Sequence, residues 1–324
     1  MKLSISRKRK WIICSLAVFF IIAGVVIYKA ADRYLIEHVE VDLSSTVSSK
    51  SNTSNLTDIE VNSTRSINSN SETYTTTDMS YKSDNKTITI EKVVTGSGSD
   101  QLVYFIADIQ LADATLLKSA FAKDKFGTNI IQVPSVIASN NNAAFAINGD
   151  YYGFRNDGII IRNGVLYRDF PARQGLALYK DGSMKVYDEN STSGEQLLAD
   201  GVWNTLSFGP ALLEKGNIIS GIESIEVDTN FGNHSIQGKQ PRTGIGIIDK
   251  NHFIFIVADG RSRGYSKGVT MTEFAQIFKD LGCTIAYNID GGGSSEMVFM
   301  DKVVNNPLGK GRERGTSDIL YISK

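Results

Sequence analysis

The feature that most constrains this chain is an apolar run that ends in a carboxylate and a cluster of glycines. Residues 284–289 form a short apolar run typical of a buried strand, Asp290 follows it, and the next three residues are glycine. Glycine lets a ligand approach the main chain closely, and successive backbone N–H groups in such a turn can bind an anion. The stretch therefore predicts a carboxylate beside an anion-binding loop, although a plain tight turn would account for the same residues. It is not a P-loop, because no Gly-Lys-Ser/Thr sequence follows the glycines.

A helix is expected just before this strand. Thr270 and Glu273 have the spacing of a capping box, in which each side chain binds the other residue's backbone N–H. Apolar residues recur at helical spacing over 274–281, and Gly282 is a typical C-terminal stop. The predicted order is therefore helix, turn, buried strand, carboxylate and glycine loop.

Three apolar runs in the chain end in an aspartate close to a glycine. We expect these three strand ends to converge on one cleft. Carboxyl groups that share a cleft can act as a general acid or base and as a nucleophile. The candidate catalytic residues are therefore Asp150, Asp259 and Asp290, each of which could instead cap a turn.

Composition excludes several other classes of function. The formal net charge is −1, so nothing favours a nucleic-acid partner. The three histidines share no ligand spacing, which argues against zinc, and no Gly-x-Ser-x-Gly elbow marks a serine hydrolase. Asp290 or Asp259 could offer oxygen ligands to Ca²⁺ or Mg²⁺, but no metal site or other cofactor is predicted.

The globular part is expected over residues 86–324. Apolar runs outnumber helical patterns, and turn sequences such as Asn163-Gly164 and Asp181-Gly182 join several of them as hairpins. This pattern predicts an α+β fold with a mixed or mainly antiparallel sheet and packed helices. Residues 114–121 also read as a helix.

The N-terminal region predicts a membrane anchor. Residues 1–10 are rich in Lys and Arg and form a cytoplasmic tail, and residues 11–31 form a transmembrane helix whose first 18 residues carry no charge. A cleavable signal peptide is the rival interpretation. Residues 32–85, dominated from residue 44 by Ser, Thr and Asn, are expected to be a disordered stalk. The remaining domain would then lie outside the cell membrane.

Five blocks of sequence together resemble the phosphodiester glycosidase family. They are Asn148–Tyr152, Pro241–Gly246, Val257–Arg261, Gly268–Phe274 and Asn288–Ser295. The blocks stand in the family's order, and the resemblance covers roughly residues 86–324. The resemblance implies cleavage of a sugar-1-phosphodiester, such as an N-acetylglucosamine-1-phosphodiester.

A phosphodiester substrate changes what the site must supply. The departing phosphate is already a stable anion, so stabilising its charge matters more than protonating it, and Arg does this with a planar fork of donors. Arg242 is the first choice, because it follows Pro241 and opens an alternating strand. The expected substrate-binding residues are Asn148, Arg242, Thr243, Arg261, Gly291, Gly292, Gly293, Ser294 and Arg314.

The sequence thus predicts a membrane-anchored extracellular hydrolase that acts on a phosphate-linked glycan of the cell envelope or an exopolysaccharide. Two alternatives stay open at this point. One is a glycan-binding ectodomain without catalysis, since a fold does not fix a function. The other is a transferase that passes the same sugar to an acceptor hydroxyl.

Overall fold

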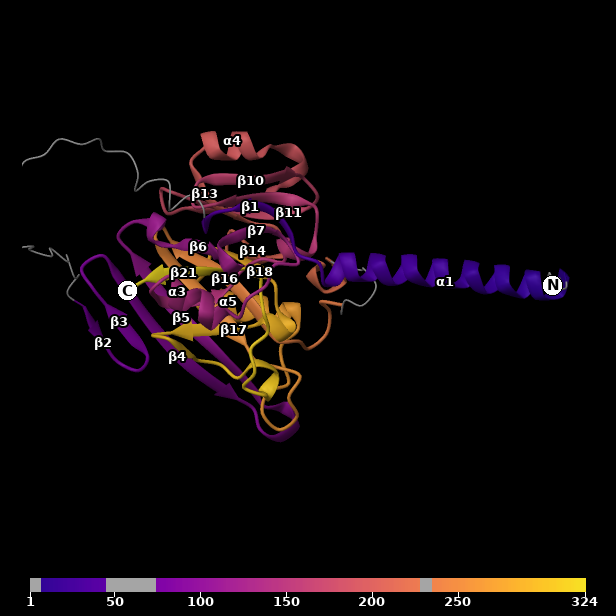
Figure 1. The fold of residues 1–324 in the computed structure, drawn as a ribbon. Coiled ribbons are helices and arrows are strands. Elements are labelled where there is room, and N and C mark those ends of the chain that lie inside the picture. Colours follow the sequence, from indigo (N-terminus) through magenta and orange to yellow (C-terminus); the bar gives the residue numbers. More distant parts are fainter. Residues whose placement is uncertain (1–6, 45–73, 228–234) are drawn as a thin grey trace, which may run out of the picture.

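The structure is a computed structural model that describes residues 7–44, 74–227 and 235–324. A long N-terminal helix projects from a domain built mainly of strands, as Figure 1 shows. Every strand pairing among the described residues is antiparallel. The predicted α+β class with mainly antiparallel sheets is therefore confirmed.

Two large sheets form the centre of the domain. The larger has nine strands in the order β15 (Asn217–Ile218), β14 (Ala211–Glu214), β18 (Ile285–Ile289), β16 (Arg242–Asp249), β17 (His252–Ala258), β5 (Leu102–Leu111), β4 (Lys86–Thr95), β3 (Ser80–Lys82) and β2 (Thr75–Thr76). The other has five strands in the order β20 (Lys302–Val303), β19 (Met297–Phe299), β8 (Ala143–Asn148), β21 (Asp318–Ser323) and β6 (Lys118–Phe121).

Smaller sheets and short helices surround this centre, and the long N-terminal helix projects from it. The smaller sheets are β12 (Met184–Asp188), β11 (Gln174–Tyr179) and β13 (Val202–Leu206); β10 (Val165–Phe170) and β9 (Gly158–Arg162); and β1 (His38–Asp42) and β7 (Lys125–Thr128). The α-helices are α1 (Arg7–Tyr34), α3 (Pro134–Asn140), α4 (Gly194–Ala199) and α5 (Met271–Asp280). The 3₁₀ turns are η1 (Gly98–Asp100), η2 (Ala114–Leu116), η3 (Ala122–Asp124), η4 (Tyr152–Phe154), η5 (Glu189–Ser191), η6 (Ile222–Ser224), η7 (Gly292–Ser294) and η8 (Pro307–Gly309).

The two large sheets pack face to face, with one helix on the outside of each. Successive side chains of a strand point to opposite faces of the sheet, so alternate residues pack between the two sheets and the others pack against the outer helices. Phe255 of β17 thus meets Phe145 of β8 in the main core, with ring centroids 5.3 Å apart. Its neighbour Ile256 lies in a second cluster with α5, while Ala146 lies in a third with α3.

Two glycines of β16 bring α5 close to the sheet. A Cβ at Gly244 would lie 2.8 Å from the ring of Phe274, and a Cβ at Gly246 would lie 2.7 Å from the ring of Phe278. The helix begins with the predicted capping box: Thr270 accepts from the Glu273 amide at 3.1 Å, and Glu273 accepts from the Thr270 amide at 2.8 Å. The α5 helix therefore covers the strands that lead to the glycine loop.

The prediction of a helix over residues 114–121 is wrong. Residues 114–116 form η2, and residues 118–121 form β6, which pairs with β21 through Ile319 and Ala120. The pairing with a strand almost 200 residues away overrides a helical pattern of only eight residues, because propensity is a weak determinant beside tertiary context.

The N-terminal helix α1 has the expected character. Its segment Ser15–Asp32 is long and apolar enough to cross a membrane, which suits either an anchor or a signal sequence. Residues 38–42 and 75–82, placed in the stalk by the sequence, include strands that pair with the domain. Residues 45–73 of the predicted stalk and residues 1–6 of the basic tail lie outside the described residues.

Candidate active site

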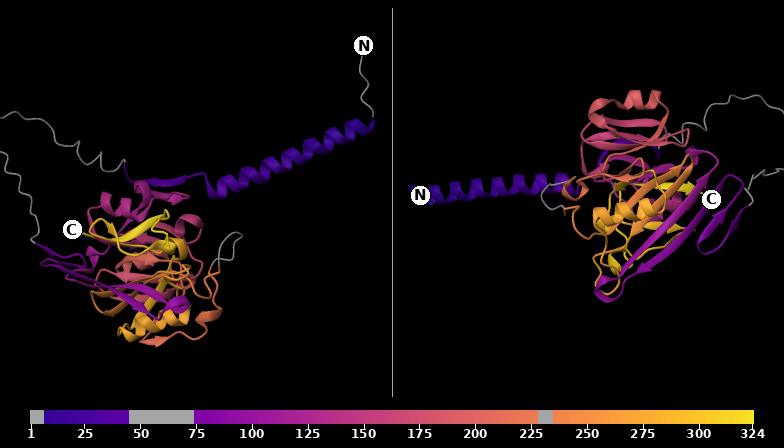
Figure 2. Two further views of the ribbon diagram at one scale, coloured as in Figure 1. Left: turned by 90° about the horizontal axis from the view of Figure 1, so that it is seen from below. Right: turned by 180° about the vertical axis from the view of Figure 1, so that it is seen from behind.

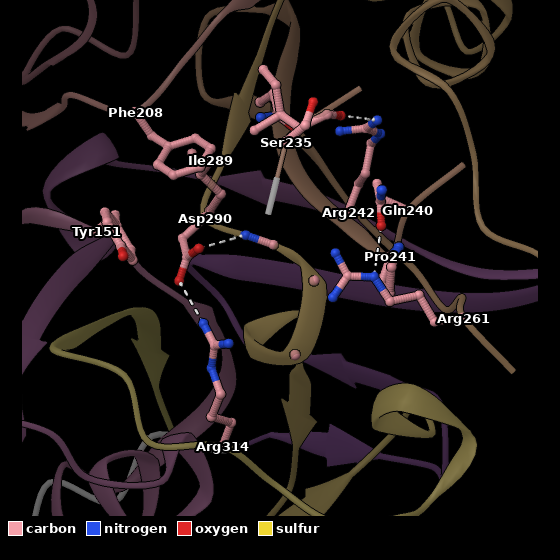
Figure 3. Close-up of a pocket in the computed structure, with 15 residues that line it drawn as sticks. Tyr151, Phe208, Ser235, Gln240, Pro241, Arg242, Arg261, Ile289, Asp290 and Arg314 are labelled. Carbon is pink, nitrogen blue, oxygen red and sulfur yellow. Dashed lines mark hydrogen bonds and ion pairs between the residues drawn. The ribbon is translucent and has the colours of Figure 1, made fainter. Parts of the chain in front are cut away.

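A pocket opens at the edge of the nine-stranded sheet where β18 ends. Strand β16 lies between β17 and β18 and is antiparallel to both, so the start of β16 meets the ends of its two neighbours. The pocket has about 730 Å³ of empty space, including the part open to solvent. Its lining residues, most of them labelled in Figure 3, are Tyr151, Phe208, Ser235, Ile236, Gln240, Pro241, Arg242, Arg261, Asn288, Ile289, Asp290, Gly291, Gly292, Gly293 and Arg314.

Asp290 supplies the carboxylate of the pocket. Its Oδ1 accepts a hydrogen bond of 2.9 Å from the Gly291 amide, and its Oδ2 lies 3.9 Å from Nη2 of Arg314. The residue is 7% exposed. Burial raises the pKa of this carboxyl, while the positive charge of Arg314 and a hydrogen bond from Ser294 act in the opposite direction. A carboxyl with a raised pKa beside an open pocket suits acid–base chemistry.

Asn148 holds the main chain of Asp290 in place. Its side-chain Nδ2 donates to the Asp290 carbonyl at 2.7 Å, and its Oδ1 accepts from Thr243 Oγ1 at 2.7 Å and from the Glu296 amide at 3.2 Å. Asn148 and Thr243 are fully buried. Both predicted substrate-binding residues therefore lie beneath the pocket and position Asp290.

Two arginines flank the glycine loop, as Figure 3 shows. Arg314 donates to Ser294 Oγ at 2.6 Å, and its guanidinium lies beside Gly293. Arg261 donates from Nε to Gln240 at 2.6 Å, and its Nη1 would lie 3.3 Å from a Cβ at Gly292. Burial and the neighbouring charge of Arg314 lower the pKa of Arg261. The two guanidinium groups create a positive field around the loop.

Arg242 lines the pocket, but most of its N–H groups donate hydrogen bonds to main-chain carbonyls of the protein. Its Nε donates to the Val269 carbonyl at 2.9 Å, and its Nη2 donates to the carbonyls of Ile236 and Gly238 at 2.6 and 2.9 Å. Burial, with Arg261 nearby, lowers the pKa of this guanidinium to about 10. Arg242 therefore fixes the segment before β16 and adds positive charge, with few donors left for a ligand.

Most backbone N–H groups of the glycine loop also donate hydrogen bonds within the protein. The amides of residues 291, 292, 294 and 295 donate to Asp290 Oδ1 and to the carbonyls of Pro241, Gly291 and Gly292, respectively. The loop thus holds its own shape and the end of β18. An anion in the pocket would find its donors chiefly on Arg261, Arg314 and Ser294.

Asp259 follows β17 at the same sheet edge, but its carboxylate points away from the pocket toward residues 265, 305 and 306. It accepts from Asn305 Nδ2 at 2.8 Å, from Tyr265 Oη at 2.8 Å and from the Asn306 amide at 3.0 Å. Burial raises the pKa of Asp259, and these hydrogen bonds oppose the rise. The residue does not line the pocket and joins two loops behind it.

Asp150 is likewise held within the protein. Its carboxylate accepts from the amides of Tyr151 and Ser207 at 2.7 and 2.6 Å, and Nη2 of Arg162 lies 3.7 Å away. Arg162 also binds Asp318 at 2.8 Å. The structure therefore brings Asp290 alone among the three candidate carboxylates into the pocket.

An aromatic wall faces Asp290 and its glycine loop. Tyr151 and Phe208 form it with ring centroids 5.9 Å apart, and the Arg155 guanidinium lies 5.0 Å and 5.1 Å from the two rings. Sequence reasoning did not find Phe208, because the Phe-Gly-Pro sequence indicates only a turn. Gln240, which orients Arg261, carried no signal either.

Metal-binding residues do not gather in the described part of the chain. Within residues 7–44, 74–227 and 235–324, no group of three or more His, Cys, Asp or Glu side chains could hold a metal ion.

Comparison with known proteins identifies a relative in sequence. The uncharacterized SPbeta prophage-derived protein YomE of Bacillus subtilis (strain 168) is 31% identical over 207 residues, which cover 61% of this chain. The chain spans only 30% of that relative's length.

Solved structures share the fold. The catalytic domain of zebrafish N-acetylglucosamine-1-phosphodiester alpha-N-acetylglucosaminidase, auto-inhibited by its pro-peptide, matches with a TM-score of 0.58 and 22% identity over 75% of this chain and 84% of that one. A hypothetical protein from Synechocystis matches with a TM-score of 0.53 and 15% identity, over 74% of this chain and 62% of that one. A putative exported protein from Burkholderia pseudomallei K96243 matches with a TM-score of 0.52 and 15% identity, over 69% of this chain and 74% of that one.

The decisive match is to a family rather than to one protein. The phosphodiester glycosidase family matches residues 141–323, which is more than half of the 324 residues and includes Asp290 and its glycine loop. The resemblance seen in the sequence is therefore confirmed, and the chain belongs to the phosphodiester glycosidase family.

Proposed function

We propose that this protein hydrolyses the bond between a sugar C1 and the oxygen of a phosphodiester, in an N-acetylglucosamine-1-phosphodiester or a similar glycan outside the cell membrane. The observation that carries the proposal is the position of Asp290. Its carboxyl, whose pKa is raised by burial, lies in a pocket with Arg261 and Arg314 beside it. This combination suits a reaction at a sugar carbon next to an anionic phosphate.

In the proposed reaction, Asp290 acts as a general base. It takes a proton from a water molecule whose oxygen attacks C1 of the sugar, and the C1–O bond to phosphorus breaks. The electron pair leaves with the phosphate, which departs as a monoester anion. A base works best when its pKa lies near the working pH, so the raised pKa of Asp290 fits this role.

Arg261 and Arg314 stabilise the departing phosphate. A charge-assisted hydrogen bond is roughly twice as strong as a neutral one, and a forked guanidinium can hold two phosphate oxygens. Tyr151 and Phe208 offer an apolar wall on which a sugar ring can rest. The roles of Asp259 and Asp150 are then to support the site, because their carboxylates are saturated with hydrogen bonds elsewhere.

The first experiment measures release of free sugar by the full chain in detergent. UDP-N-acetylglucosamine and a synthetic sugar-1-phosphodiester serve as substrates, and Asp290→Asn is compared with Asp100→Asn, a change at an exposed carboxyl of η1. We expect the first variant to lose at least about 10²-fold in kcat, the lower range for a general base, and the second to match the parent protein.

Other outcomes separate the alternatives. Sugar binding without release by the parent protein would contradict a hydrolase and favour a glycan-binding ectodomain. Product that forms only with an added acceptor glycan would favour a transferase. Loss of activity in EDTA, restored by Ca²⁺ or Mg²⁺, would add a metal to the reaction.

A further inference from the structure

The chain enters the domain immediately after α1. Only Leu35, Ile36 and Glu37 separate the end of α1 from β1, which pairs with β7 inside the domain. Three residues span at most about 11 Å when fully extended. The backbones of β1 and β7 approach so closely that a Cβ at Gly127 would lie 1.9 Å from the His38 carbonyl oxygen.

Side chains of the domain hold this junction. Asn129 donates from Nδ2 to the carbonyls of Asp32 and Ile36, at 3.0 and 2.8 Å. Lys123 forms an ion pair with Glu37, and Arg168 forms another with Glu40 at 3.2 Å. The end of α1 is therefore fixed to the domain by side chains as well as by strand pairing.

Residues 45–73 cannot then act as a spacer between α1 and the domain. Their preceding neighbour, β1, is paired with β7. The strand that follows them, β2, is paired with β3 at the end of the nine-stranded sheet. Both flanking strands belong to the same domain, so the number of residues between them does not set the distance between the domain and α1.

The pocket lies close to this junction. Tyr151, which lines the pocket, stacks on Phe154 with ring centroids 4.9 Å apart. Phe154 and Arg155 in turn line a second cavity together with Asp32 at the end of α1. One 3₁₀ turn, η4, thus connects the pocket wall to the base of the helix.

The ribbon views agree with this placement. In Figures 1 and 2, the orange segment that leads into β16 lies on the side of the domain from which α1 projects. That segment supplies Gln240 and Pro241 to the pocket. The hairpin of β2 and β3 lies on the opposite side. At the junction itself, the apolar side chain of Leu35 is 78% exposed and is therefore free to enter a membrane interface.

We propose that α1 holds the pocket against the membrane surface, and that the substrate is a sugar-1-phosphodiester whose second alcohol is a membrane lipid. This inference rests on the proposed function and names the substrate class. Water attacks the sugar C1, Asp290 takes the proton, and the C1–O bond breaks. The products are a free sugar and a lipid phosphate monoester that stays in the membrane.

The placement is tested with the full chain in vesicles that contain an energy-acceptor lipid. A donor dye is attached to Ser224→Cys in η6, where Gln237 of the segment before β16 donates to the Ile222 carbonyl, or to Asp78→Cys in the hairpin of β2 and β3. Both variants are made in a Cys14→Ala background. We expect at least twofold higher energy transfer from position 224. Equal transfer from both positions, or failure of the chain to stay with the vesicles, would overturn the proposal.

Two matched insertions separate the junction from a stalk. A 20-residue Gly/Ser linker between Leu35 and Ile36 should at least halve the transfer from position 224, because such a linker spans about 25 Å on average. The same linker between Ser48 and Ser49 should leave transfer unchanged. The reverse result would show that residues 45–73 are the spacer and would overturn the proposal.

The substrate class is tested on the same three proteins. Their rates are compared on a sugar-1-phosphate esterified to a long-chain alcohol in the vesicles and on the soluble methyl ester. The insertion after Leu35 should lower only the first rate, by at least tenfold. Cleavage of the methyl ester alone by the parent chain would overturn the lipid substrate but keep the proposed function. Cleavage of neither would contradict the proposed function itself, while the energy transfer would still report the placement.

Discussion

The side-chain amide of Asn148 donates a 2.7 Å hydrogen bond to the main-chain carbonyl of Asp290 and joins the two large sheets at the pocket floor. Asn148 ends β8 of the five-stranded sheet, and Asp290 follows β18 of the nine-stranded sheet. The other end of the Asn148 amide accepts from Thr243 of β16. One buried amide therefore sets where the carboxylate of the pocket lies.

Thr243→Val tests this positioning. The change keeps the shape of the side chain but removes the hydroxyl that donates to Asn148, so it should cost about 1 kcal/mol of unfolding free energy. With Asn148 less restrained, Asp290 loses its alignment, and kcat should fall about tenfold while KM stays constant. Denaturant unfolding and steady-state kinetics measure both effects. Thr243→Ser keeps the hydroxyl and serves as the control; a Val variant with the parent kcat would refute the positioning role.

Arg314→Gln tests the electrostatics of the pocket. The positive charge of Arg314 opposes the rise that burial causes in the pKa of Asp290, so its removal should raise that pKa further. If Asp290 must be ionised to act as a base, the acid limb of kcat/KM against pH then moves to higher pH. The lost phosphate contact, worth about 1.5–3 kcal/mol for a charged hydrogen bond, should lower kcat/KM at the optimum by about 10- to 100-fold.

Two further variants control this experiment. Arg314→Lys keeps the charge but loses the planar fork, so the acid limb should stay near its original pH while KM rises. Arg312→Gln removes a charge from the exposed residue two positions earlier and should change neither quantity. An acid limb that moves to lower pH in the Gln variant would exclude the proposed interaction between Arg314 and Asp290.

The local elements around the pocket could be predicted because their signals are local. The capping box of Thr270 and Glu273 begins α5, and the apolar run before Asp290 forms β18. The directions of the other two carboxylates could not be predicted in this way. Asp259 turns to Asn305 and Asp150 turns to the Ser207 amide, partners that lie 46 and 57 residues away in the sequence.

The pairing of β1 with β7, through which the chain enters the domain, could not be predicted either, because the two strands are far apart in the sequence. His38–Asp42 is an exposed strand of five residues, and its partner β7 begins more than 80 residues later. Nothing within the polar N-terminal region indicates that pairing. Similarly, Arg242 lines the pocket, but its three acceptors are main-chain carbonyls, which the sequence does not reveal.

A pair of carboxyls next to the glycine loop, of which Glu296 is buried and Glu313 is partly exposed, predicts how stability depends on pH. Glu296 is fully buried, and neither of its carboxyl oxygens has a donor partner. It interacts instead with the carboxyl of Glu313, which accepts from Ser135 and precedes Arg314. Two carboxyls can share a hydrogen bond only when one is protonated. Burial and Glu313 raise the pKa of Glu296 to about 10.

The sign of the effect follows from proton binding. Between the ordinary pKa of a glutamate and about 10, the folded state holds a proton on Glu296 that the unfolded chain has released. The stabilisation from this group is therefore complete at acid pH and falls as the pH rises, by at most about 1.4 kcal/mol per pH unit. Glu296→Gln keeps the shape of the protonated acid without a titrating group.

We expect the Gln variant to gain stability over the parent protein as the pH increases from 5 to 9. Thermal unfolding at several pH values measures the difference in Tm. Asp301→Asn, which removes an exposed carboxylate paired with Lys324, is the control and should show no such pH-dependent gain. A constant difference between the Gln variant and the parent across this range would show that Glu296 does not retain its proton.

Gly292 combines an unusual backbone angle with a close neighbour, and these two effects can be measured apart. Its φ is +64°, and a Cβ would lie 3.3 Å from Nη1 of Arg261. Gly201 has a φ of +88° but no atom within 4 Å of a Cβ. Alanine at either site should cost about 1–2 kcal/mol of stability, because an L-residue is strained at such angles.

Only Gly292→Ala should also affect the substrate. The new methyl group displaces the Arg261 guanidinium from the loop, so KM for a phosphodiester should rise about tenfold, the loss of one charge-assisted contact. Gly201→Ala, equally strained, should keep the parent KM. Denaturant unfolding combined with kinetics distinguishes the two effects. An unchanged KM in Gly292→Ala, or an equal rise in both variants, would mean that Arg261 does not bind the phosphate, and Arg314 would then have to stabilise the leaving group without it.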